Sequence, residues 1–261
     1  RAFGPGYLLG AGGARPGWKA LLGGNRPLHL GAYPMERVKR VDKPTTVIDE
    51  ASVPRIPKRH NMFVRAAHGD LGPGPQRALD HFNFISKEPF AGAMLPVLAG
   101  MVPLQSGQAA PQVAPGTDDP AANAQAVKAA LYYLGADLVG VGPAKSYCWY
   151  SHDHDGTPIE PYHRNAIVIL IDQGYETMEG ASGDDWISGS QSMRAYMRCS
   201  LIGGIVADHL RRLGWSARTH SVIEEDVLHI PVILNAGLGE LSRIGELVLN
   251  PFVGPRFKSL V

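Results

Sequence analysis

The stretch Ala166–Asp172, with the sequence AIVILID, contains six apolar residues in a row, most of them β-branched or aliphatic. A continuous apolar run of this length is typical of a strand that is buried on both faces of its sheet. We therefore expect this strand to lie at the centre of the sheet, with the remaining elements arranged around it.

Further elements are expected before and after this strand. The pattern predicts a helix over residues 117–134, capped by Thr117 or Asp118, with a proline in its first turn where a missing N–H has no cost. Residues 137–141 follow as a buried strand. A long helix is expected from about residue 188 to 214, with two arginines in its last turn, where cations interact favourably with the helix dipole.

The other segments complete an α/β pattern. An apolar segment over 90–98 is expected to pack as a helix, and residues 105–116 form a Gln/Ala/Pro linker. Residues 215–221 and 228–234 are expected to be two more strands. The order of helices and strands, without internal repeats, predicts an α/β (α+β) sandwich, in which a mixed sheet is flanked by helices.

Composition excludes several classes of protein. The 261 residues have a formal net charge of +1, so no overall field directs the chain to nucleic acid or to a membrane. Hydrophobic residues make up 44 % and charged residues 19 %, which is ordinary for a folded domain. No apolar run reaches the roughly 18 residues of a membrane span. Two cysteines can neither build a disulfide framework nor supply the four thiolates of an iron–sulfur cluster.

The chain divides into two parts of different composition. Residues 1–60 are rich in Gly, Pro and basic side chains and are expected to form an extended arm that lies on another surface. Residues 61–261 are expected to form the domain proper. Because the chain begins with Arg1 and ends just after a Gly-Pro-Arg turn, we expect it to be an internal piece of a longer protein.

The segment Tyr147–Gly156 concentrates aromatic and metal-ligating side chains. Two histidines and two aspartates at 152–155 could bind a metal, but alternate side chains of an extended loop diverge, so a polar surface loop is the favoured interpretation. Tyr147, Trp149 and Tyr150 could line a flat pocket or fill the core. The sequence leaves both possibilities open.

The long helix carries an unusual stripe. Ser192, Tyr196, Cys199 and Gly203 are four, three and four residues apart and therefore share one face. The stripe is small and weakly polar. The Gly203-Gly204 pair weakens the helix by roughly 1 kcal/mol per residue relative to alanine. It indicates either a bulky group packed against the backbone or a close contact between helices.

A third segment with candidate functional residues is rich in glycine and runs from Asn235 to Lys258. The spacing of Gly237 and Gly239 resembles a dinucleotide fingerprint, but the third glycine is Gly245, so the Rossmann interpretation is weak. Such a segment still offers backbone and side-chain donors to a phosphate or to amides. Lys258 is a cation that could project into the same site.

Five segments in the same order carry a resemblance to a known family. They are Pro34–Arg59 (PMERVKRVDKPTTVIDEASVPRIPKR), Asp119–Gly142 (DPAANAQAVKAALYYLGADLVGVG), Tyr150–Ile159 (YSHDHDGTPI), Ala236–Gly245 (AGLGELSRIG) and Asn250–Lys258 (NPFVGPRFK). Together they resemble the cobalamin-binding region of reductive dehalogenases. The resemblance implies a nitroreductase-like sandwich that binds base-off cobalamin with no histidine below the cobalt, so neither His152 nor His154 is expected to be a ligand.

The resemblance also implies the roles of individual residues. The proton donor of the family corresponds to Tyr196 and its basic partner to Lys258, and an ammonium beside a phenol is expected to lower the pKa of the tyrosine. Phe63, Trp149 and Tyr150 are expected in the substrate pocket, which would suit a halogenated aromatic or phenol. The expected cofactor-binding residues are Ser192, Asn235, Gly237, Leu238, Gly239, Ser242, Arg243, Gly254 and Arg256.

Family members also carry two [4Fe–4S] clusters on C-x2-C-x2-C-x3-C-P runs, which this sequence lacks. We expect them in a segment downstream of Val261, together with a ferredoxin, flavodoxin or fused reductase as electron donor, and we expect the piece alone to be inactive. A cytoplasmic location is favoured, and an exported form stays open.

Two alternatives to a reductive dehalogenase remain. One is an epoxyqueuosine reductase-like enzyme, whose arm lacks Met-Glu-Arg-x-Lys-Arg and which should be more basic. The other is a non-catalytic corrinoid-binding domain.

Overall fold

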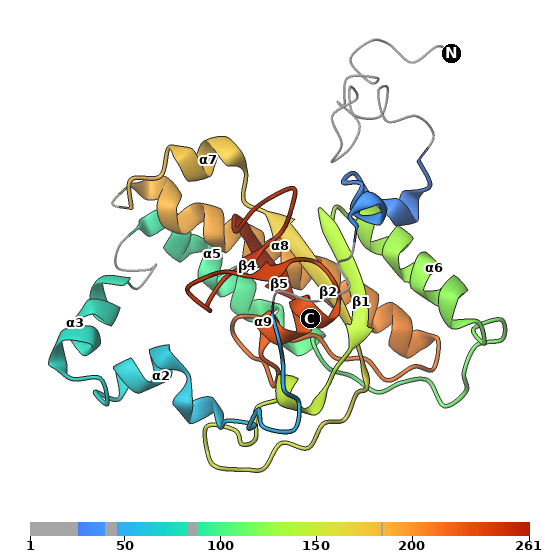
Figure 1. Ribbon diagram of the computed structural model, residues 1–261, viewed down its shortest axis with the longest axis horizontal. Coiled ribbons are helices and arrows are strands. Elements are labelled where there is room, and N and C mark those ends of the chain that lie inside the picture. Colours follow the sequence, from blue (N-terminus) through green and yellow to red (C-terminus); the bar gives the residue numbers. More distant parts are fainter. Residues whose placement is uncertain (1–25, 40–45, 83–87, 184) are drawn as a thin grey trace, which may run out of the picture.

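A sheet of three antiparallel strands forms the centre of the computed structural model of the chain (Figure 1). The structure describes residues 26–39, 46–82, 88–183 and 185–261. The strand order is β1-β2-β5, with β1 at Leu138–Pro143, β2 at Asn165–Asp172 and β5 at Phe257–Leu260. The prediction that 166–172 is the central strand is confirmed.

The remaining elements are helical, apart from a small β3-β4 ribbon at Glu240–Leu241 and Val248–Leu249. The helices are α2 (Met62–Ala67), α3 (Pro73–Phe82), α5 (Pro89–Gly100), α6 (Pro120–Tyr133), α7 (Tyr175–Glu179), α8 (Trp186–Arg212) and α9 (His229–Asn235). Short 3-10 turns occupy Leu28–Leu30, Met35–Arg37, Lys58–His60, Val102–Leu104 and Ser146–Cys148. The class of helices packed on a sheet, predicted from the sequence, is confirmed, but the predicted mixed sheet is wrong among the described strands, which pair only in antiparallel fashion.

The two faces of the sheet bury different cores, because successive side chains of a strand point to opposite faces. Ile169 and Ile171 of β2 pack with α6 and α8. Val168 and Leu170 pack on the other face, with α9 and the segment around Trp149. The fold therefore has three layers, and Figure 1 shows α2 and α3 on the far side of the molecule from α6.

Local sequence signals explain the two long helices. Asp119 caps α6 by accepting hydrogen bonds from the first-turn amides, and Pro120 occupies the first position. Asp185 caps α8 in the same way through the amides of Ile187 and Ser188. Both helices were predicted, with starts within a few residues of those observed, but the cap of α6 is Asp119 and not the predicted Thr117 or Asp118.

Two predicted strands are wrong. Residues 228–234 form most of α9, because a short apolar run fits a buried helix as well as a strand and Pro231 falls in the first turn, where it breaks no hydrogen bond. Residues 215–221 contain no strand. His220 exchanges two backbone hydrogen bonds with Val261, but no longer ladder follows.

The predicted arm is described only at residues 26–39 and 46–60, so the rest of the 1–60 expectation lies outside the described residues. Where it is described, the arm follows the surface of the domain. The amide of Lys58 donates to the carbonyl of His152, and the amide of Ser151 donates to the carbonyl of Ile56. In the described part of the chain, no helix is both long and apolar enough to cross a membrane.

Candidate active site

Helix α8 lies across β5 and presents its small, weakly polar stripe to that strand. The thiol of Cys199 lies 3.7 Å from the carbonyl oxygen of Lys258. A Cβ added at Gly203 would lie 2.5 Å from Cδ2 of Leu260. The shared face predicted from the spacing is confirmed, and the bulky group packed against Gly203 is a side chain of β5.

Tyr196 and Lys258 meet at this contact. Nζ of Lys258 lies over the phenol ring, 5.1 Å from its centroid. Burial raises the pKa of Tyr196 to about 12 and lowers the pKa of the Lys258 ammonium. No carboxylate of the described residues forms an ion pair with Lys258.

The expectation that the ammonium lowers the pKa of Tyr196 is wrong. The cation lies over the face of the ring, and the cost of burying a phenolate exceeds any attraction that this position provides. Tyr196 therefore keeps its proton at neutral pH. A protonated phenol beside a cation can donate a proton to a negative charge that develops nearby.

The sequence analysis missed two residues that form a pair near β5, Glu225 and His229. The carboxylate of Glu225 lies 3.2 Å from Nε2 of His229, and Nδ1 of His229 lies 2.9 Å from Oγ of Ser259, the neighbour of Lys258 in β5. Burial raises the pKa of Glu225, and its charge contributes to the raised pKa of Tyr196. The only sequence signal was the acidic run 224–226, which is ordinary on a solvated surface.

The first part of the glycine-rich segment is held by backbone packing. Asn235 ends α9, and its Oδ1 accepts a hydrogen bond from the Tyr147 hydroxyl at 2.9 Å. Gly237 is exposed at φ +70°, whereas Leu238 is buried in the core. A Cβ at Gly239 would lie 2.5 Å from a backbone oxygen of β4, which explains the glycine without a ligand.

The second part of this segment offers two side-chain donors, Ser242 and Arg243, and an open space at Gly254. The hydroxyl of Ser242 is buried and has no hydrogen-bond partner among the described residues. Arg243 is exposed, and Gly254 has a φ of +57° with open space where a side chain would be. These three residues therefore remain available to a ligand.

Two other predicted cofactor contacts have partners within the protein. Arg256 forms a two-pronged ion pair with Asp172 at the end of β2, at 2.9 and 3.1 Å. The Ser192 hydroxyl accepts a hydrogen bond from the Gln173 side chain at 3.0 Å. Both pairs join the carboxyl end of β2 to its neighbours, and a role in cofactor binding stays a prediction.

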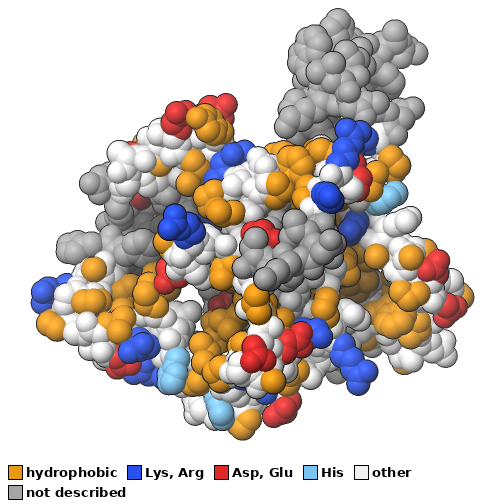
Figure 2. Space-filling view, viewed as in Figure 1, with side chains coloured by type: hydrophobic (Ala, Val, Ile, Leu, Met, Phe, Trp, Pro, Cys, Tyr) orange, Lys and Arg blue, Asp and Glu red, His pale blue; other side chains and the backbone are white. Residues whose placement is uncertain are grey.

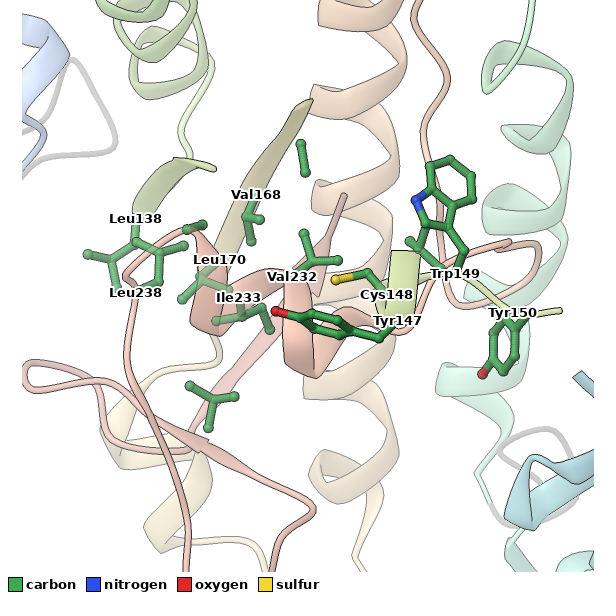
Figure 3. Close-up of a cluster of buried hydrophobic side chains, with 14 of the residues drawn as sticks. Leu138, Tyr147, Cys148, Trp149, Tyr150, Val168, Leu170, Val232, Ile233 and Leu238 are labelled. Carbon is green, nitrogen blue, oxygen red and sulfur yellow. The ribbon is translucent and has the colours of Figure 1, made fainter. Parts of the chain in front are cut away.

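The three aromatic residues expected in the substrate pocket lie in different surroundings. Trp149 is 1 % exposed and packs edge-on against Tyr162, with ring centroids 4.6 Å apart. Tyr150 is 3 % exposed, and Phe63 is half-exposed on α2. Figure 3 shows the rings of Trp149 and Tyr150 pointing in different directions from adjacent positions. The structure does not bring the three together, and their contact with substrate stays a prediction.

The polar loop 152–155 is tied to the arm by an ion pair. Asp153 lies 3.1 Å from Nζ of Lys58. His152 and His154 are exposed. In the described part of the chain no cluster of three or more His, Cys, Asp or Glu side chains is arranged to hold a metal ion.

The protein is a three-layer domain of helices packed on a sheet. Its candidate site is the buried contact of the Tyr196 phenol on α8 with the Lys258 ammonium on the edge strand β5. Solved structures similar to this chain have the same fold. Catabolic reductive dehalogenase NpRdhA matches with a TM-score of 0.87 and 52 % identity, over 98 % of this chain and 37 % of that chain. Its complex with 3-bromo-4-hydroxybenzoic acid matches with a TM-score of 0.85, at the same identity and coverage.

A further structure of a reductive dehalogenase, which suggests a mechanism for B12-dependent dehalogenation, matches with a TM-score of 0.87 and 52 % identity, again over 98 % of this chain and 37 % of that one. No protein-family model matches the chain, and no curated protein matches it. The chain belongs to the reductive dehalogenases. It spans a little over a third of the length of these solved structures.

Proposed function

We propose that the protein catalyses the reductive dehalogenation of a small organohalide with cobalamin as cofactor, and that Tyr196 donates the proton. The observation that carries the proposal is the buried contact between Tyr196 and Lys258 in a chain 52 % identical to reductive dehalogenases. The alternatives, an epoxyqueuosine reductase-like enzyme and a non-catalytic corrinoid domain, have no comparable support.

The residues of the second half of the glycine-rich segment fit such a cofactor. Cobalamin has amide side chains and a phosphate, and Ser242 has a buried hydroxyl without a partner among the described residues. Exposed Arg243 supplies a cation, and the open space at Gly254 lets a ligand approach the backbone. We propose that these residues hold the cofactor in its base-off form, with no histidine of this chain as a cobalt ligand.

Replacing a halogen by hydrogen requires two electrons and one proton, and releases halide. The cofactor, when bound, supplies the electrons; we propose that two [4Fe–4S] clusters outside this chain, reduced by a ferredoxin, flavodoxin or reductase, deliver them. Tyr196 supplies the proton: its O–H bond breaks, a C–H bond forms on the substrate, and a phenolate is left.

Lys258 has a defined part in this step. The negative charge of a phenolate is shared with its ring, so an ammonium over the ring face attracts the phenolate more strongly than the phenol. The cation therefore stabilises Tyr196 after proton transfer more than before it, which is the condition for a lower barrier. Burial keeps competing water away from both groups.

We propose a halogenated phenol or related aromatic as the substrate. NpRdhA forms a complex with 3-bromo-4-hydroxybenzoic acid. Lys258 has no carboxylate partner among the described residues, so its ammonium can also pair with a substrate phenolate. Phe63, Trp149 and Tyr150 are the aromatic residues that we propose for contact with the substrate ring.

The test is Tyr196→Phe in the full-length, cobalamin-loaded enzyme, measured by halide release. General acid catalysis contributes about 100-fold or more, so we expect at least that loss of turnover with cobalamin retention unchanged. Tyr133→Phe is the matched control, because Tyr133 is 79 % exposed on α6 and should leave turnover unchanged. Retained turnover in Tyr196→Phe would overturn the role of this tyrosine.

A further inference from the structure

Residues 26–37 of the arm form a compact turn on helix α6 (Figure 1). The guanidinium of Arg26 forms a two-pronged ion pair with Glu36, with N–O distances of 2.6 and 2.9 Å, which closes the turn. Gly31 passes close to the Tyr132 ring of α6, so that an added Cβ would lie 2.5 Å from Cζ of that ring. The turn is therefore fixed on the domain and presents the residues after Gly31 in a defined position.

The loop formed by residues 250–254, which contains Gly254, is organised by one buried side chain. Asn250 is 3 % exposed, and its backbone exchanges hydrogen bonds with that of Gly254, at 3.1 and 2.9 Å. Oδ1 of Asn250 accepts hydrogen bonds from two amides of the loop. Nδ2 donates to the carbonyl of Leu238 at 2.6 Å. Asn250 therefore fixes the shape of this loop and joins it to the chain just before β3.

Two arm residues contact this loop directly. Tyr33 stacks on Phe252, with ring centroids 5.6 Å apart and an angle of 30° between the ring planes. Sδ of Met35 accepts a hydrogen bond from Nδ2 of Asn250 at 3.6 Å. Tyr33, Met35 and Phe252 are partly buried and pack against the same core. The arm and the loop therefore share an apolar contact with defined geometry.

Tyr33 also contacts the chain on the other side of Gly254. Its hydroxyl donates a hydrogen bond to Oδ2 of Asp172 at 3.4 Å. Asp172 in turn holds Arg256 in a two-pronged ion pair. Gly254 lies two residues after Phe252 and two residues before Arg256. One arm side chain therefore holds the loop on both sides of Gly254, once directly and once through Asp172.

We propose that Tyr33 and Met35 are positioning residues of the cofactor site, which hold the 250–254 loop in the conformation that receives cobalamin. Gly254 has open space where a side chain would be, so a ligand can approach its backbone. A loop that is fixed before the ligand arrives loses less conformational freedom on binding, and the affinity is higher for that reason. The identity of the ligand rests on the proposed function, whereas the contact between arm and loop does not.

Amide hydrogen exchange on the full-length protein without cobalamin tests whether the arm holds the loop. In Tyr33→Leu we expect the amides of residues 252–254 to exchange about three- to tenfold faster than in the parent, which is the effect of losing one aromatic pair. The amides of Ile169 and Ile171 in the sheet should be unchanged. Tyr33→Phe, which keeps the stacked ring, should retain most of the protection. Parent-like exchange at 252–254 in Tyr33→Leu would overturn the proposal.

Cobalamin affinity tests the link to the cofactor and is measured by titration of the full-length protein, followed by absorbance. Tyr33→Leu and Phe252→Leu should each weaken binding about three- to tenfold. The double variant should weaken binding by about the same factor as either single variant, because both remove the same contact. Losses that multiply in the double variant, or an unchanged affinity in Tyr33→Leu, would overturn the proposal.

Two control variants separate this contact from a general effect on the protein. Tyr133 is 79 % exposed on α6, so Tyr133→Leu should change neither the exchange at 252–254 nor the affinity. Lys58→Met weakens the attachment of the arm at a distant point and should also leave the exchange at 252–254 unchanged. Faster exchange at 252–254 in either control would contradict a specific role of Tyr33.

The two measurements also distinguish a failure of this proposal from a failure of the proposed function. A parent protein that binds no cobalamin would contradict the proposed function and the ligand named here, while the exchange at 252–254 would still decide whether the arm holds the loop. A parent that binds cobalamin as tightly as Tyr33→Leu does would contradict only the positioning role. Where Tyr33→Leu does not fold, Phe252→Leu removes the same ring pair from the loop side, with the same expected results and the same refuting ones.

Discussion

Replacing Asp226 by asparagine removes the central carboxylate of a buried network that ties the arm to the domain. Oδ1 of Asp226 lies 2.8 Å from Nζ of Lys58, and Oδ2 accepts a hydrogen bond from the Tyr162 hydroxyl at 2.7 Å. Arg218 also pairs with Oδ2. Asp226 follows Glu225 in the chain, so the network also positions the carboxylate whose charge contributes to the raised pKa of Tyr196.

The expected magnitude follows from the burial of the two charges. The side chains of Lys58 and Asp226 are 7 % and 8 % exposed, and the second carboxylate on Lys58, Asp153, is 43 % exposed. Removing one partner of a buried pair leaves an uncompensated charge, so Asp226→Asn should cost about 3–5 kcal/mol of unfolding free energy. Lys58→Met should cost less, about 1–3 kcal/mol, because Asp226 keeps Arg218 and Tyr162.

Urea denaturation of both single variants and of the double variant measures these quantities. Because the two residues are in contact, the double variant should lose about 1–3 kcal/mol less than the sum of the single losses. Asp70→Asn is the control: Asp70 pairs with Arg59, both side chains are more than a third exposed, and the loss of this pair should have little effect.

The pH dependence has a definite sign. Burial alone would raise the pKa of Asp226, but hydrogen bonds from Lys58 and Tyr162 outweigh it and hold the pKa below its ordinary value. The stability that Asp226 contributes is therefore present above its unfolded pKa and is lost as the pH falls through the folded one. The reasoning would be refuted if Asp226→Asn cost less than about 1 kcal/mol at pH 7 and kept the acid dependence of the parent chain.

Two further predictions concern β5 and the glycine-rich segment. Burial lowers the pKa of Lys258, so the folded chain binds this proton less tightly than the unfolded chain does. The unfolding free energy should therefore rise with pH between the folded pKa and about 10.4. Lys258→Met should be at least as stable as the parent at pH 7 and should lack that rise in pH-dependent urea denaturation. Gly239→Ala places a Cβ 2.5 Å from a backbone oxygen of β4 and should cost about 1–3 kcal/mol in thermal unfolding. The control Gly100→Ala, at the open end of α5, should be neutral or stabilising. Equal melting temperatures of the two variants would contradict the close packing of Gly239 against β4.

On the face shown in Figure 2, acidic and basic side chains are interspersed among hydrophobic ones. This pattern agrees with the net charge of +1. The charges that matter for the proposed chemistry are those inside the protein, where the dielectric is low and interactions are strong.

Much of the candidate site followed from local pattern and from motif resemblance. The spacing of Tyr196, Cys199 and Gly203 is a property of any helix, so their common face could be predicted before their partner was known. The motif resemblance then paired Tyr196 with Lys258, and the structure places both in contact. The pKa of Tyr196 could not be predicted, because it depends on burial and on where the cation lies relative to the ring.

The sequence by itself determined the elements whose pattern admits one solution: the seven-residue apolar strand 166–172, the capped helix ending near residue 134 and the long helix ending near residue 212. Only the tertiary structure decided that 228–234 is a helix, that the Glu225–His229 pair lies against Ser259 of β5, and that Lys58 pairs with Asp226. The physical reason is the range of the interactions. Periodicity and capping act within a few residues of the chain, whereas burial and charge pairing join segments more than a hundred residues apart and exist only once the chain has folded.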